Sequence, residues 1–63
     1  MKYTYIELLD GLDACLADYG NRDLEYPDHI DPDEDLTEDQ AKEVFNFNDG
    51  DVDAIIEYLE GDE

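Results

Sequence analysis

The chain has 63 residues, of which 21 are Asp or Glu and 3 are Lys or Arg, so its formal net charge is −18. This charge argues against binding to nucleic acid or to anionic membrane surfaces, because both require cations on the protein. The length predicts a single small domain, residues 1–63, without room for a deep pocket that excludes water, so we expect no enzymatic activity. A hydrophobic share of 41% nevertheless predicts that the chain folds.

The first predicted element is a helix over residues 4–19. Thr4 followed by Glu7 has the spacing of a capping box, in which each residue caps the backbone of the other at the helix start. Gly11 is expected to weaken this helix by about 1 kcal/mol relative to Ala, and Gly20 is expected to end it. Apolar residues recur with spacings of three and four, as in a helix with one buried face: Tyr5, Leu8, Leu9, Leu12, Cys15, Leu16 and Tyr19.

Residues 21–36 interrupt this periodicity, and we expect them to form a long acidic connection. The two prolines of the chain lie here and disfavour helix at the residues before them. Leu24 and Tyr26 are expected to return to the core. Such a run of like charges repels itself, which is typical of a solvated loop or an interaction surface. Carboxylates are densest between positions 28 and 39: Asp28, Asp31, Asp33, Glu34, Asp35, Glu38 and Asp39.

A second capping box, formed by Thr37 and Gln40, predicts a short helix over about residues 38–46. Phe47 is expected to pack at the end of this helix, and Asn48-Asp49-Gly50 predicts a turn. The buried side of the helix is expected to carry Ala41, Val44 and Phe45.

The third predicted helix is capped by Asp49 or Asp51 and ended by Gly61. Together the three helices predict an all-α fold, namely a small three-helix bundle with a long acidic loop between helices 1 and 2. The apolar stripe of the third helix consists of Val52, Ile55, Ile56 and Leu59.

The acidic segment contains a partial calcium motif. Asp31-x-Asp33-x-Asp35 resembles the start of an EF-hand loop. However, Leu36 stands at the sixth position, where glycine is needed, and Lys42 stands at the twelfth position, where a bidentate Glu is needed. We therefore expect no metal site.

The remaining reactive side chains do not predict chemistry. His29 is the only histidine and is expected to lie in a solvated loop, since no second His or Cys is near it in the sequence. Cys15 lies on the apolar stripe and is expected to be a small buried hydrophobic residue; as the only cysteine, it allows no internal disulfide. We expect no catalytic residue and no cofactor.

Residues 40–61, QAKEVFNFNDGDVDAIIEYLEG, resemble the last two helices of a ubiquitin-associated (UBA) domain. That resemblance implies a compact helical fold and a small module that binds a partner protein through an apolar patch. The chain departs from the family before this stretch, where a long acidic segment replaces the short loop that usually contacts ubiquitin. The matching residues are Ala41, Val44, Gly50, Val52, Ala54, Ile55, Tyr58 and Leu59.

The whole chain is similar in composition to the acidic DNA-mimic inhibitors of phages and mobile elements, which include anti-CRISPR and anti-restriction proteins. This resemblance implies a monomer or homodimer that binds a basic nucleic-acid-binding protein, a nuclease or a CRISPR effector, and not nucleic acid itself. No signal peptide or membrane span is evident, so we expect a cytoplasmic protein, located in the host cytosol if it is phage-encoded. The expected contact residues are Asp28, Asp31, Asp33, Glu34, Asp35, Glu38, Asp39, Asp51, Asp53, Glu57 and Tyr26.

Two alternatives remain open at this point. One is the UBA-like interaction module. The other is the ordinary solvated surface of a protein from a halophile, since halophiles favour surfaces that are rich in acids and poor in lysine.

Overall fold

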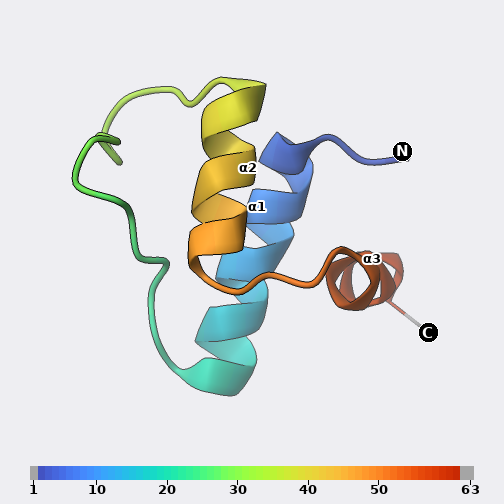
Figure 1. Ribbon diagram of the computed structural model, residues 1–63. Coiled ribbons are helices and arrows are strands. Elements are labelled where there is room, and N and C mark those ends of the chain that lie inside the picture. Colours follow the sequence, from blue (N-terminus) through green and yellow to red (C-terminus); the bar gives the residue numbers. More distant parts are fainter. Residues whose placement is uncertain (1, 62–63) are drawn as a thin grey trace.

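The computed structural model describes residues 2–61, and within this range the chain is helical without any strand. The helices are α1 (Tyr5–Cys15), continued by a π-helical turn, η1 (Leu16–Gly20), then α2 (Glu38–Phe47) and α3 (Val52–Glu60) (Figure 1). Both α2 and α3 pack against α1, which therefore lies at the centre. The all-α class predicted from the sequence is confirmed.

Local sequence signals set the helix starts. In α1, the Glu7 N–H donates to Thr4 Oγ1 at 3.2 Å while the Thr4 N–H donates to Glu7 Oε1 at 2.9 Å, so the predicted capping box is confirmed. Thr37 and Gln40 form the same pair of bonds at the start of α2, at 3.2 and 2.9 Å. Asp51, one of the two residues predicted to cap α3, accepts bonds of 3.0 and 3.4 Å from two backbone N–H groups of its first turn.

The end of the first helix differs from the prediction. Gly20 lies inside η1, and Asn21, with φ of 53°, adopts the left-handed conformation that follows the helix. Tyr19, predicted to lie on the buried stripe, is 79% exposed. The reason is the π-helical turn: it holds more residues per turn than an α-helix, so a spacing of three and four no longer keeps Tyr19 in line with Leu8 and Leu12.

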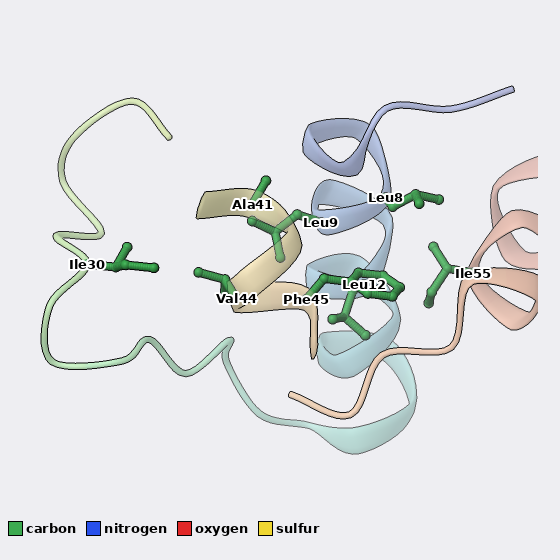
Figure 2. Close-up of a cluster of buried hydrophobic side chains, with 8 residues drawn as sticks. All are labelled: Leu8, Leu9, Leu12, Ile30, Ala41, Val44, Phe45 and Ile55. Atoms are coloured by element: carbon green, nitrogen blue, oxygen red, sulfur yellow. The ribbon is translucent and has the colours of Figure 1, made fainter. Parts of the chain in front are cut away.

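The core lies between α1 and its two partner helices, and Phe45, Leu8 and Val44 are its largest fully buried side chains. Tyr5 packs edge-on against Phe45, with 5.8 Å between ring centroids. Burying each large aliphatic or aromatic side chain contributes about 1.5–3 kcal/mol. Figure 2 shows the buried set: Leu8, Leu9, Leu12, Ile30, Ala41, Val44, Phe45 and Ile55.

Gly11 allows α3 to approach α1. A Cβ at this position would lie 2.9 Å from Ile55 Cγ2 and 2.9 Å from Leu59 Cδ2, closer than side-chain atoms pack. The residue that was expected only to weaken the helix is therefore the point where the two helices meet.

Gly50 has a similar packing function in the turn between α2 and α3. A Cβ here would lie 2.6 Å from Phe45 Cε2, so only glycine fits beside the buried ring. The left-handed residue of this turn is Asp49, with φ of 58°. Phe47, which was predicted to pack at the helix end, is instead 52% exposed.

The connection between η1 and α2 covers residues 21–37 and contains neither helix nor strand. It is long because α1 and α2 run in the same direction: the Tyr5 N–H at the start of α1 donates to Glu38 Oε2 at the start of α2, at 2.6 Å. The chain must therefore return along the whole first helix before α2 can begin (Figure 1).

Four apolar side chains attach this connection to the core. Leu24 and Tyr26 are half-buried against it, as predicted, and Leu36 is too. Ile30, in the middle of the acidic stretch, is only 3% exposed, which the sequence pattern did not predict.

Asn48 attaches the backbone of the connection to α2. Its Nδ2 donates to the Glu25 carbonyl at 2.8 Å and to the Val44 carbonyl at 2.7 Å, while its Oδ1 accepts from the Glu25 N–H at 3.0 Å. One amide thereby joins an extended segment to the last turn of a helix.

Candidate functional site

The acidic surface is the main candidate, because every Asp and Glu between residues 2 and 61 is exposed and no charged or polar side chain in that range is buried. Few cations offset it. Over the described residues, Lys2 Nζ lies 2.6 Å from Glu60 Oε2 and His29 Nε2 lies 2.6 Å from Glu43 Oε2. The hydrogen bond and the charge of Glu60 raise the pKa of Lys2. Most carboxylates therefore present uncompensated charge to the solvent.

The acids of the connection lie in ordered turns. Asp31 Oδ1 accepts from the Asp33 N–H at 2.9 Å, and the Asp31 carbonyl accepts from the Glu34 N–H at 3.2 Å. A preceding turn is closed by the Ile30 N–H, which donates to the Pro27 carbonyl at 3.0 Å. Exposed predicted contact residues on this connection are Asp28, Asp31, Asp33, Glu34 and Asp35.

Glu38 has a structural function that the sequence pattern did not indicate. Its carboxylate accepts from the Tyr5 N–H, a free donor at the positive end of α1, while Glu38 itself lies in the first turn of α2. Asp39, the next predicted contact residue, is exposed in the same turn. Both extend the acidic surface of the connection along the start of α2.

Tyr26 lies half-buried in a shallow depression whose rim includes Glu34 and Asp35. Ile6, which is 44% exposed, and Leu36 contribute apolar surface to the same depression. Part of the Tyr26 ring is therefore committed to the core.

The predicted contact residues of α3 belong to a separate group. Asp51, Asp53 and Glu57 are exposed, and Figure 1 shows α3 on the side of the α1–α2 pair opposite to the connection. The structure thus divides the predicted site into two acidic regions: the connection side (Tyr26, Asp28, Asp31, Asp33, Glu34, Asp35, Glu38 and Asp39) and the α3 side (Asp51, Asp53 and Glu57).

A groove lies between η1 and α3. Tyr19 and Cys15, which line it, were predicted to be buried, and Asp18, which also lines it, was not among the predicted contact residues. Tyr58 Oη donates to Asp18 Oδ2 at 2.5 Å, which raises the pKa of Tyr58 to about 12. The rings of Tyr19 and Tyr58 meet edge-on, with 6.0 Å between centroids. Cys15, predicted to be buried, is half-buried and lines this groove. The packing of α3 on α1 and the π-helical turn together bring these side chains to one place, and no spacing rule in the sequence signals that turn.

Within residues 2–61, no group of three or more His, Cys, Asp and Glu side chains is arranged to hold a metal ion. No helix in that range has the length and hydrophobicity needed to cross a membrane.

A scan against protein-family models, a search of curated proteins and a search of solved structures each found no match to this chain.

Proposed function

We propose that the protein is a non-enzymatic inhibitor that imitates the charge of nucleic acid and occupies the basic surface of a nucleic-acid-binding protein, such as a CRISPR effector or a restriction nuclease. The observation that carries this proposal is the exposure of every described carboxylate on an ordered helical core. In this proposal the helices form a small bundle, and the acidic connection is a long loop that serves as its principal contact surface.

The charge spacing supports the mimicry. Duplex DNA carries about one negative charge per 1.7 Å of its axis. An α-helix rises 1.5 Å per residue, so acids on neighbouring turns of packed helices and on the adjoining connection approach a comparable density. A basic groove that has evolved to displace the counterions of DNA can form the same contacts with such a surface.

The connection side is the better contact surface of the two acidic regions. Before a partner binds, Ile30 and the side-chain amide of Asn48 attach this part of the chain to the rest of the protein. A hydrogen bond within the turn at Asp31 fixes the local backbone. A surface that is ordered before binding loses less entropy when it binds. The same contacts therefore give higher affinity there than on a segment that has to become ordered when it binds.

The test begins with capture of the partner from a cognate host lysate, followed by competition with labelled duplex DNA at two salt concentrations. We expect mutual exclusion, and weaker binding at higher salt because small ions screen the opposed charges. Simultaneous binding of duplex and protein to the partner would contradict the mimicry.

A matched pair of variants locates the surface. The first replaces Asp31, Asp33, Glu34 and Asp35 with Asn or Gln, and the control makes the same change of four charges at Asp13, Glu60, Asp62 and Glu63, which are not among the expected contact residues. We expect the first variant to lose far more affinity. Equal losses would mean that only total charge matters.

A second candidate function is the UBA-like interaction module. It is favoured by the exposure of Phe47, 52%, at the end of α2 and by the half-buried position of Val52 at the start of α3. If Phe47→Ala abolishes partner binding while charge reversal at Asp31 and Asp33 leaves it unchanged, this module replaces the mimicry.

A further inference from the structure

The groove between η1 and α3 combines aromatic rings with carboxylates. Tyr19 and Tyr58 contribute rings that stand nearly perpendicular, with an interplanar angle of 81°. Asp18 and Glu57 contribute the charge, and Cys15 and Ala54 also line the groove. Aromatic faces attract cations through their quadrupole, and carboxylates pair with cations directly.

The exposure of Tyr19 has no explanation in the packing of the core. Its side chain is 79% exposed, although Cys15 and Leu16, the preceding residues of the predicted stripe, are partly buried against the core. The π-helical turn that rotates it outward is a rare element that occurs frequently at functional sites. The same turn carries Asp18, whose carboxylate is held in place by the Tyr58 hydroxyl at 2.5 Å.

We propose that this groove receives an arginine side chain of a basic partner protein, with the guanidinium stacked on Tyr19 and paired with Glu57 and Asp18. This inference rests on the proposed function, since it adds a second contact with the basic partner, on the α3 side, to those that the connection side forms. The charge of the groove selects a cation, and its combination of ring faces and carboxylates suits the planar guanidinium, which both stacks and forms paired hydrogen bonds. The ammonium of lysine is a compact point charge, which has neither a plane to stack on a ring nor a fork for paired hydrogen bonds.

The protonation state of the groove is compatible with this occupant. The bond to Asp18 raises the pKa of Tyr58 to about 12, so this hydroxyl stays protonated at neutral pH and continues to orient the Asp18 carboxylate. The nearby cation of the chain itself, Arg22, folds against Gly20 and is not among the side chains that line the groove.

The experiment uses the full chain and three blocked tripeptides, Gly-Arg-Gly, Gly-Lys-Gly and Gly-trimethyllysine-Gly, at physiological salt. Amide chemical shifts of Cys15, Ala54 and Gly61 report on the groove, and the rate of Cys15 alkylation reports on its occupancy. We expect the arginine peptide to shift these resonances saturably and to slow alkylation, and to bind more tightly than the other two. Tighter binding of either lysine peptide would overturn the assignment to arginine.

Point variants distinguish binding of the arginine peptide in the groove from its general electrostatic attraction to the acidic surface. Tyr19→Ala should weaken the arginine peptide about two- to fivefold, the range of an exposed cation–π contact. Because Tyr19 is so exposed, this variant should melt as the parent does by circular dichroism. Glu57→Gln should weaken binding more than Asp33→Asn, which removes one charge on the opposite side. Equal effects of these two variants, or shifts spread evenly over the acidic surface, would overturn the proposal.

The outcomes for the captured partner distinguish this inference from the proposed function. A partner that competes with duplex DNA but is indifferent to Tyr19→Ala refutes the arginine groove and leaves the mimicry intact. A groove that binds the arginine peptide while duplex and protein bind the partner together refutes the mimicry alone.

Discussion

The two acidic regions of the molecule are held in place in different ways. On the connection side, residues 21–37 have no regular secondary structure, yet Ile30 is 3% exposed and Asn48 bonds to both backbone groups of Glu25. The α3 side is a regular helix, yet among its side chains only Ile55 is fully buried, and Leu59 remains 38% exposed. Regular structure and attachment to the core are therefore separate properties here, since each region has one fully buried side chain, Ile30 in the connection and Ile55 in α3.

The largest expected effect comes from the anchor of the connection. Ile30→Ala removes a buried side chain and leaves a cavity, so we expect a loss of about 2–5 kcal/mol in the free energy of unfolding. The measurement is urea denaturation followed by circular dichroism. Ile6→Ala is the matched control, because Ile6 is 44% exposed, and it should cost far less. Equal losses would mean that Ile30 is not an anchor.

The next effect tests the attachment of α3. Gly11→Leu places a side chain where a Cβ alone would lie 2.9 Å from Ile55 and Leu59, so α3 has to move. Overpacking of this kind costs about 1–3 kcal/mol. Amide hydrogen exchange should accelerate in α3 more than in α2, and Ala14→Leu, at an exposed position of α1, should leave exchange unchanged. Uniform acceleration would show that α3 is not separately attached.

A smaller effect is expected from Asn48→Ala. It removes the bonds to Glu25 and leaves the Val44 carbonyl without its side-chain partner. Because two of these bonds are exposed and water can replace them, we expect a total loss of about 0.5–1.5 kcal/mol in the free energy of unfolding. Exchange of the Glu25 amide should accelerate, while Asn46→Ala on the exposed face of α2 should not affect it. An unchanged Glu25 amide would contradict the role of this side chain.

The smallest effect concerns Tyr58 on the α3 side. Its pKa in the folded protein is raised from 10.0 to about 12. The bond to Asp18 therefore contributes fully below pH 10 and is lost as the pH rises through about 12. Ultraviolet titration should show one tyrosine that ionises near pH 12, and Tyr58→Phe should remove it. In Asp18→Asn, which loses the carboxylate, the late ionisation should move toward pH 10; no such movement would place its cause elsewhere.

The sequence by itself determined the helix starts and most of the apolar faces. Thr4 with Glu7, Thr37 with Gln40, and Asp51 act through bonds to backbone groups only a few residues away, so local spacing is sufficient to recognise them. The inward positions of Leu8, Leu12, Val44 and Ile55 follow from helical periodicity for the same reason. Within the predicted site, the sequence also determined that the acids are exposed, because burying an unpaired charge is costly.

The tertiary structure alone decided the remaining features, because each depends on a group distant in the sequence. Ile30 is buried because α1 and α2 run in the same direction and the chain has to return alongside α2 (Figure 1). Gly11 and Gly50 are required by the approach of Ile55 and by the ring of Phe45. Tyr19 is the exception, because the π-helical turn that shifts its register is local, yet no spacing rule in the sequence signals it. The division of the acids into two regions follows from the packing of α3 on the far side of α1, which no local pattern encodes.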